Sequence, residues 1–250
     1  MEQPSLDPRQ QFGCAVDHYA NGRIGYAAEL FELLKQSCPT TGALLDLGCG
    51  TGIATKQLWD CGYRNLVGCD VDPAMLAVAK QVCPDVSWIC AEASALPFES
   101  AAFEVVALFG SFHWFCHAAA IQEIRRVLKP GGLIVVVKKQ EIGPFFDEYF
   151  AWLEQVSGQV LDFPKERYRP MQKLKEQRFE IVSQRKWHSH ESLTMDQALS
   201  FCQSIYAWNS LAQAQKKLVA PKLSDFLAPW IIEGQFIRPI QTQMLVAQPF

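Results

Sequence analysis

This 250-residue sequence lacks a long hydrophobic run. Its longest uninterrupted aliphatic stretch is Leu133 to Val137, whereas a membrane-spanning helix needs about 20 apolar residues. The start, Met1 to Asp7, is neither basic nor apolar, so we expect no secretory signal. A strong charge of one sign is also missing, since 23 Lys and Arg face 26 Asp and Glu. We therefore expect neither membrane nor nucleic-acid binding.

The nine cysteines are odd in number and lack the Cys-x-x-Cys spacing that is typical of metal sites. They lie in apolar segments, where a free cysteine packs as a small hydrophobic residue. A chain of this length can bury a sufficient core without disulfides. We therefore expect a reduced, cytoplasmic protein that binds no metal.

Short apolar segments alternate with helix-length segments through the first half of the chain. They are nearly continuous in apolar residues, which is typical of strands covered on both faces. Such alternation predicts a doubly wound, parallel α/β sheet. The five predicted strands are residues 43–47, 66–70, 86–90, 103–108 and 132–137; two later strands are predicted from Phe179 towards Trp187 and over Ile240 to Ala247.

A glycine-rich segment, Asp46-Leu47-Gly48-Cys49-Gly50-Thr51-Gly52, follows the first strand. Glycines allow a sharp turn and let a ligand approach the backbone without meeting a Cβ. In a doubly wound sheet, ligands bind beyond the carboxyl ends of the strands. The second strand ends in Asp70, whose carboxylate can accept hydrogen bonds from both hydroxyls of a ribose. Together these features predict a cofactor that contains adenosine.

The glycine spacing distinguishes between cofactors. The spacing Gly-x-Gly-x-Gly differs from the Gly-x-Gly-x-x-Gly of nicotinamide dinucleotide sites, and no Gly-x-x-x-x-Gly-Lys-Ser/Thr loop is present. Asp46 places a negative charge near the loop, which disfavours a pyrophosphate but suits a cationic amino acid. The pattern therefore favours S-adenosylmethionine, which carries a sulfonium and an α-ammonium and no phosphate.

Four runs resemble motifs of the class I S-adenosylmethionine-dependent methyltransferases: LLDLGCGTGIATKQL, GCDVDPAMLAVAK, AEASALPFESAAFEVVALFGSFHWF and EIRRVLKPGGLIVV. These motifs are similar to those of the methyltransferase type 11 family, which includes trans-aconitate methyltransferases. The resemblance covers residues 43–137, with weaker similarity over 19–26 and 194–210. It implies a Rossmann-like, mostly parallel seven-stranded sheet with an antiparallel last strand and a helical cap insert.

The resemblance also implies where the cofactor lies. Gly48 and Gly50, with Cys49 between them, would contact its methionine portion, and Asp46 would lie near the ammonium. Asp70 would hold the ribose. The other contacts that the resemblance implies are Val71, Glu92 and Ala93 at the adenine, and Phe109 beside the methionine portion.

An N-terminal segment of the family, Tyr-x-x-x-Arg-Pro-x-Tyr-Pro, closes over the cofactor. Here the corresponding run begins with Tyr19 and Arg23 and lacks both prolines. The resemblance implies that Tyr19 and Arg23 contact the cofactor, with Arg23 beside its carboxylate. One domain is expected over 1–250, with a lid (1–28), a cofactor-binding core (43–137) and helical cap segments (143–178 and 188–236).

The residues expected at the methyl acceptor follow the fourth strand. His113 can take a proton from a hydroxyl or amine, or it can simply orient the acceptor. Trp114 and Trp208 are candidate acceptor contacts, and the basic stretch 165–186 either faces solvent or attracts a carboxylate. We therefore expect an enzyme that methylates an oxygen or nitrogen of a small molecule, with a carboxylate-bearing metabolite as one candidate.

The alternatives are a methyltransferase that acts on tRNA or protein, a protein that binds S-adenosylmethionine without transfer, and a nicotinamide dehydrogenase. The product of the favoured reaction is S-adenosylhomocysteine. The oligomeric state does not follow from the sequence.

Overall fold

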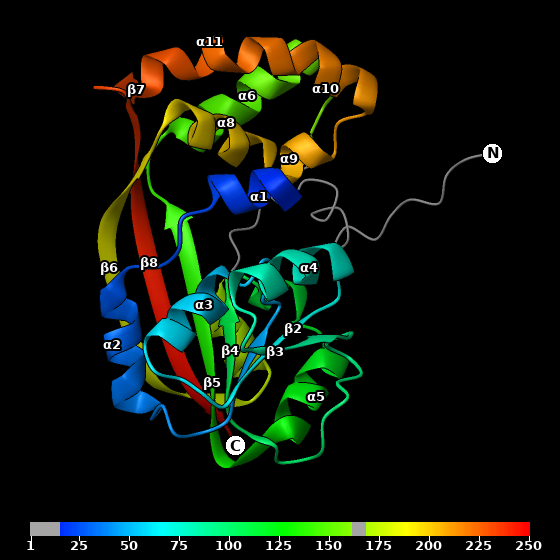
Figure 1. Cartoon of the computed structure of the whole chain (residues 1–250), viewed down its shortest axis with the longest axis vertical. Coiled ribbons are helices and arrows are strands. Elements are labelled where there is room, and N and C mark those ends of the chain that lie inside the picture. The colour runs from blue at the N-terminus through cyan, green and yellow to red at the C-terminus, as the bar shows by residue number, and fades with distance from the viewer. Residues whose placement is uncertain (1–15, 162–168) are drawn as a thin grey trace, which may run out of the picture. The chain divides into compact units, whose positions relative to one another are not determined.

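The computed structural model describes residues 16–161 and 169–250, which form two compact units (Figure 1). In the described ranges, unit 1 comprises residues 16–24, 140–161 and 188–241, and unit 2 comprises 25–139, 169–187 and 242–250. Residues 1–15 of the predicted lid and 162–168, which include the first residues of the basic stretch, lie outside the described ranges. The division into one domain with lid, core and cap stays a prediction.

The described residues of the sheet confirm a mostly parallel, doubly wound α/β fold. The pairs β1–β2, β1–β4, β2–β3 and β4–β5 are all parallel. Along the sheet the order is β3-β2-β1-β4-β5-β8-β6, so the direction of winding reverses between β1 and β4. The first strands are β1 (Leu44–Leu47), β2 (Leu66–Asp70), β3 (Ser87–Cys90), β4 (Phe103–Phe109) and β5 (Leu128–Glu141).

The last strand is antiparallel, as the resemblance implied. β6 (Phe179–Leu193) lies next to β8 (Gln235–Pro249). The end of β8 meets the start of β6, because the Gln248 amide donates to Glu180. The start of β8 meets the end of β6, where the Ser192 hydroxyl donates to Gln235. A two-residue strand, β7 (Ile231–Ile232), pairs with β8 in addition to the predicted strands.

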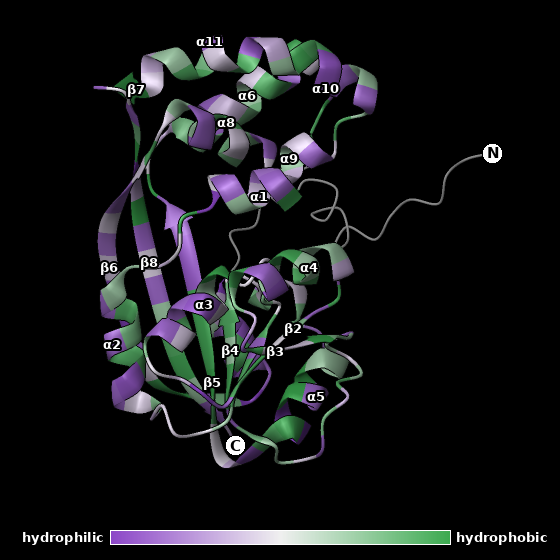
Figure 2. Cartoon of the chain, in the orientation of Figure 1, coloured by the Kyte–Doolittle hydropathy of each residue, from purple (hydrophilic) through white to green (hydrophobic). Residues whose placement is uncertain are grey.

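Helices cover both faces of the sheet in unit 2. Apolar residues of α2 and α3 pack on one face, and those of α5 and α7 pack on the other. β4 and β5 are accordingly apolar along most of their length within this unit (Figure 2). The unit 2 helices are α2 (Ala28–Ser37), α3 (Ile53–Asp60), α4 (Pro73–Val82), α5 (Ala118–Val127) and α7 (Pro170–Glu176).

Unit 1 has a separate, aromatic core in which Phe145, Tyr149 and Phe201 are buried. The aromatic-rich segment after Gly143 predicts a helix, which is present as α6. Thr194 with Gln197 three residues later predicts a capping box, which is present at the start of α8. Among the described helices, none has the length and apolar composition of a membrane-spanning segment. The unit 1 α-helices are α1 (Val16–Gly22), α6 (Phe145–Ser157), α8 (Met195–Gln203), α9 (Tyr206–Asn209), α10 (Gln213–Val219) and α11 (Leu223–Leu227).

Candidate functional site

The glycine-rich segment forms the turn between β1 and α3. The backbone N–H groups of Gly48 and Cys49 both donate to the Cys69 carbonyl, at 2.8 and 3.1 Å. These bonds hold the turn against β2. Gly48 and Gly50 both have positive φ, at 73° and 54°, a region that residues with a Cβ rarely adopt. The turn therefore depends on glycine at both positions.

The two glycines differ in what surrounds them. A Cβ built on Gly48 would lie 2.6 Å from the Ser111 Cβ and 2.8 Å from the Phe115 ring. Around Gly50, by contrast, no described atom lies within 4 Å of such a Cβ. Gly48 is thus needed for packing against the segment after β4, whereas the side of Gly50 faces open space. Contact of either glycine with a ligand stays a prediction.

Asp70 ties the end of β2 to the glycine turn. Its Oδ2 accepts a hydrogen bond from the Gly50 N–H at 2.8 Å, and its Oδ1 accepts one from the Asp72 N–H at 3.0 Å. Burial raises the pKa of Asp70, although these two N–H groups oppose the shift. Each carboxylate oxygen can accept more than one hydrogen bond. Asp70 can therefore hold the turn and still accept bonds from a ligand.

Asp46 lies at the base of the turn and is fully buried. The Thr55 hydroxyl donates to its Oδ2 at 2.6 Å, while Oδ1 has no hydrogen-bond partner among the described residues. Burial raises the pKa of Asp46 to about 7; the Thr55 bond opposes this shift and the Asp70 charge adds to it. A buried acceptor without a partner is costly, so this oxygen is suited to a donor or cation from a ligand.

We expect Asp46→Asn to stabilise the ligand-free protein most at high pH. The pKa of Asp46 rises from 3.8 unfolded to about 7 folded, so its ionisation costs stability as pH rises through that range. The amide carries no charge, and the advantage of the variant should grow from near zero below pH 4 to on the order of 1–3 kcal/mol above pH 7. Urea unfolding of both proteins at pH 4, 5.5 and 8 measures it. A difference that does not change with pH would contradict the raised pKa.

The loop after β3 lies beside the end of β2. The Ala91 N–H donates to the Asp70 carbonyl at 3.1 Å, and the Cys90 thiol contacts the Val71 carbonyl at 3.6 Å. Glu92 and Ala93 follow directly, with Ala93 buried and Glu92 half-buried. The predicted adenine contacts Val71, Glu92 and Ala93 therefore lie on two adjacent strand ends.

Asp72 caps α4, as the Asp72-Pro73 pair predicts. Its Oδ1 accepts a hydrogen bond from the Ala74 N–H at 2.8 Å, and Pro73 is the first helical residue. Asp72 is buried, and its capping role agrees with the interpretation that Asp70 is the residue available to a ribose.

Phe109 ends β4, and its ring packs against Tyr26, with ring centroids 5.2 Å apart. The backbone of Tyr26 is held at both polar groups: its N–H donates to Gln57 Oε1 and its carbonyl accepts from Gln57 Nε2, each at 2.8 Å. The spacing of Tyr26 from Leu30 and Leu33 predicts that it lies on the apolar face of a helix, but α2 begins at Ala28. Tyr26 corresponds to the second tyrosine of the family's N-terminal segment, and this correspondence could have identified it as a site residue.

His113 and Trp114 lie in a short 3-10 helix (Phe112–Trp114) after β4, and their rings are 4.8 Å apart. Surrounding protein atoms, and then the charge of Lys138, lower the pKa of His113 to about 4, although the residue keeps exposed surface. His113 is therefore neutral at pH 7 and can accept a proton. His117 instead caps α5, since its Nδ1 accepts from the Ala120 N–H.

Comparison with known proteins gives a family match over this part of the chain. Residues 45–136 match the methyltransferase domain family. An uncharacterised methyltransferase of Mycobacterium tuberculosis is 31% identical over 155 residues, which are 62% of this chain and 60% of that protein. The chain therefore aligns with about three fifths of the length of this relative.

Two solved structures support the Rossmann-like methyltransferase fold. One, assigned as a type II methyltransferase of Anaeromyxobacter dehalogenans, has a TM-score of 0.61 and 19% identity, and the match covers 91% of this chain and 99% of the other. The other is a S-adenosylmethionine-dependent methyltransferase of Thiobacillus denitrificans in complex with S-adenosylhomocysteine. Its TM-score is 0.52 at 15% identity, with full coverage of both chains. At these identities the likeness establishes the fold alone.

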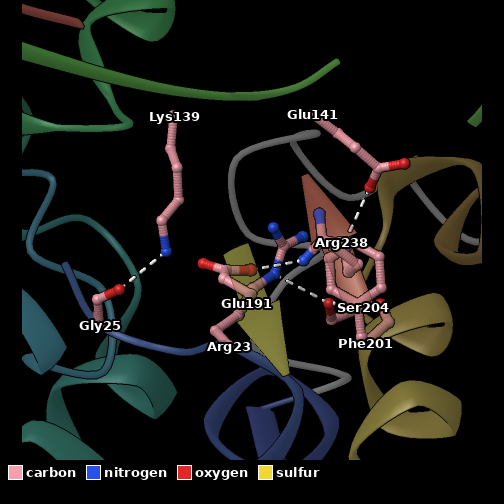
Figure 3. Close-up of polar contacts among 8 residues, drawn as sticks. All are labelled: Arg23, Gly25, Lys139, Glu141, Glu191, Phe201, Ser204 and Arg238. Atoms are coloured by element: carbon pink, nitrogen blue, oxygen red, sulfur yellow. Dashed lines mark hydrogen bonds and ion pairs between the residues drawn. The ribbon is translucent and has the colours of Figure 1, made fainter. Parts of the chain in front are cut away.

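The remaining predicted residues, Tyr19, Arg23 and Trp208, belong to unit 1. Arg23 Nε donates to the Ser204 hydroxyl at 3.0 Å (Figure 3), and its guanidinium lies 5.2 Å from the Tyr19 ring centroid. Trp208 is 5% exposed and packs in the unit 1 core. The structure thus assigns these residues to a different unit from the strand ends, and their roles toward cofactor and acceptor stay predictions.

Proposed function

We propose that this chain is a S-adenosylmethionine-dependent methyltransferase that transfers a methyl group to an oxygen or nitrogen of a small molecule. The proposal rests mainly on Gly50 and Asp70, which follow two adjacent strands. The backbone of Gly50 borders open space, and the Asp70 carboxylate lies beside it. The domain match over residues 45–136 and the fold of the Thiobacillus denitrificans enzyme support it. Its product would be S-adenosylhomocysteine.

The residues at the strand ends fit this cofactor. Asp46 Oδ1 is buried without a described partner and would accept from, or attract, the α-ammonium. Asp70 would accept hydrogen bonds from the ribose hydroxyls, and Gly50 leaves room for the cofactor beside the backbone. The Asp46 carboxyl group beside the turn disfavours a pyrophosphate, because like charges repel. It therefore argues against a nicotinamide dinucleotide.

When bound, S-adenosylmethionine supplies a methyl group on a sulfonium, which makes that carbon electrophilic and the thioether a good leaving group. The task of the protein is then to align the acceptor with that carbon and to exclude water. Holding the two reacting groups in the correct orientation can accelerate a reaction as much as an effective reactant concentration of about 10⁵–10⁸ M. Phe109 and Trp114 supply apolar surface at the end of β4. A carboxylate acceptor needs no base, whereas a hydroxyl acceptor would pass its proton to a ring nitrogen of His113.

If the acceptor must lose a proton, we expect His113→Gln to lower kcat by about 10²-fold, the lower end of the usual contribution, because a lowered pKa makes His113 a weak base. Because the pKa of His113 is lowered to about 4, the wild-type rate should fall only as pH drops towards 4. Initial rates from pH 3.5 to 9, with cofactor affinity measured by calorimetry, check both points. An unchanged kcat would leave His113 with a packing role beside Trp114.

The proposal is tested by incubating the protein with methyl-labelled S-adenosylmethionine and separate small-molecule, RNA and protein fractions. We expect label in the small-molecule fraction, and much less label with the Asp70→Asn variant at a subsaturating cofactor concentration. Tight cofactor binding with no label in any fraction would instead support a binding protein that does not transfer the methyl group.

A macromolecular acceptor is the second candidate, and exposed cations on α7 and β6 favour it. Those in the described part of the basic stretch all lie at the surface, and Lys173 pairs with Glu176 at 3.0 Å. They are Arg169, Lys173, Lys175, Arg178, Arg185 and Lys186. Exposed cations of this kind are equally compatible with simple solvation and with binding of a polyanion. Methyl label found only in the RNA or protein fraction would favour this candidate. Cytoplasmic location stays a prediction.

A further inference from the structure

An indole ring from β3 covers a position in β2 that has no side chain. The register places Asp46, Gly68 and Trp88 in one row across β1, β2 and β3. Residues in such a row point to the same face of a parallel sheet, so Asp46 and Trp88 lie on either side of the glycine. A Cβ built on Gly68 would lie 2.4 Å from both Cε3 and Cζ3 of the Trp88 ring. Only glycine at position 68 therefore leaves room for this ring.

The same ring contacts the end of the glycine-rich turn. A Cβ built on Gly52 would lie 2.7 Å from Cη2 of Trp88 and 3.1 Å from the Ala79 Cβ. Gly52 closes the turn, because its N–H donates to the Cys49 carbonyl at 3.0 Å. Its carbonyl accepts the first hydrogen bond of α3, from the Lys56 N–H at 2.8 Å. The Trp88 ring thus packs against the residue at which the turn ends and the helix begins.

A hydrogen bond fixes the orientation of the Trp88 ring. Its Nε1–H donates to the carbonyl of Cys83, the residue after α4, at 3.0 Å. The ring is half-buried against the apolar core on the face of α2 and α3. The Cys49 Sγ lies 3.3 Å from the Cβ built on Gly68, so a side chain of the turn occupies the same space over β2. Trp88 and the turn therefore pack together over Gly68.

We propose that Trp88 is a positioning residue for the cofactor: its ring holds the glycine-rich turn in the shape that binds S-adenosylmethionine. The inference rests on the proposed function and deepens it, because it adds a residue outside the predicted cofactor contacts. Glycine has no side chain with which to fix a turn, and it loses more conformational freedom on folding than any other residue. A ligand site must be held to within about 0.5 Å by the packing around it. Trp88 can supply this packing because it contacts β2 and the end of the turn at once.

Trp88→Phe in the full chain tests the proposal. Phenylalanine is shorter than the indole and lacks its N–H, so the contact with Gly52 and the hydrogen bond to Cys83 are lost. We expect affinity for S-adenosylhomocysteine, measured by calorimetry, to fall by about tenfold or more, as for a site displaced by a fraction of an ångström. If Trp88→Phe does not fold, Trp88→Tyr, with its longer side chain, replaces it in every measurement.

Trp59→Phe is the matched control. Trp59 is also half-buried against the same apolar core, but it lies in the last turn of α3, whereas the glycine-rich turn precedes the first. Both variants should lose thermal stability, because both remove part of a packed ring. Only Trp88→Phe should lose affinity for S-adenosylhomocysteine. A ring that merely filled the core would instead give equal affinities in the two variants.

A spectroscopic readout on the unaltered protein separates positioning from core packing. In protein labelled with ¹⁵N-tryptophan, the indole N–H signals of Trp88 and Trp59 are identified by their loss in the two variants. We expect saturating S-adenosylhomocysteine to shift the Trp88 signal and to leave the Trp59 signal in place. An unshifted Trp88 signal, or equal affinities of Trp88→Phe and Trp59→Phe, would overturn the inference while leaving the proposed function intact. Failure of the wild type to bind S-adenosylhomocysteine would overturn the proposed function, and this inference with it.

Discussion

Asp70→Asn is expected to weaken S-adenosylmethionine binding by about 10- to 100-fold, the range for losing one hydrogen bond to a charged group. The side chain keeps its size and one acceptor for the Gly50 N–H, so the turn should survive. It loses the second carboxylate oxygen, and with it the ability to accept both ribose hydroxyls while bonded to Asp72. Titration calorimetry at pH 7.5 measures the loss.

The control for this variant is Asp85→Asn, which removes the same charge from an exposed residue of unit 2. Thermal unfolding without ligand should place Asp70→Asn close to the wild type, or slightly above it, because burial disfavours the charged form of Asp70. Unchanged cofactor affinity in Asp70→Asn would refute the placement of the adenosyl group at the end of β2.

Gly48→Ala is expected mainly to destabilise the fold, whereas Gly50→Ala is expected mainly to weaken cofactor binding. Gly48→Ala should destabilise the fold by about 2–5 kcal/mol, since strain at positive φ adds to a collision with Ser111. Gly50→Ala should cost only about 1–2 kcal/mol, from backbone strain alone. Its Cβ would fill the space proposed for the cofactor, and affinity should fall by about tenfold or more, as for overpacking of a filled site. Thermal unfolding and calorimetry separate the two effects.

Gly131→Ala is the matched control for Gly50→Ala. Gly131 has a φ of 75°, and no described atom lies within 4 Å of a Cβ built there. Both variants should lose similar stability, but only Gly50→Ala should lose cofactor affinity. A Gly50→Ala protein that binds the cofactor normally would mean that the open side of this glycine does not face the ligand.

Local features of the fold were predictable because they depend on residues close together in the chain. The Asp72-Pro73 helix start and the Thr194 capping box are confirmed, and each rests on hydrogen bonds within three residues. The segment 66–70 is β2 in full. β5, in contrast, was predicted over 132–137 and spans Leu128–Glu141. Its polar end extends past Phe109, the last residue of β4, while β5 is hydrogen-bonded to β8 on its other side. Pairing of distant segments has no signal in a local apolar pattern.

The sequence by itself determined the doubly wound sheet and the glycine–aspartate motif at its strand ends, since periodicity and turn chemistry are local properties. Only the tertiary structure decided that Gly48 packs against Ser111 while Gly50 faces open space. It also decided that the Trp88 ring covers Gly52 and Gly68. Such contacts join segments far apart in the chain, and only the packing of strands and helices determines which side chains meet.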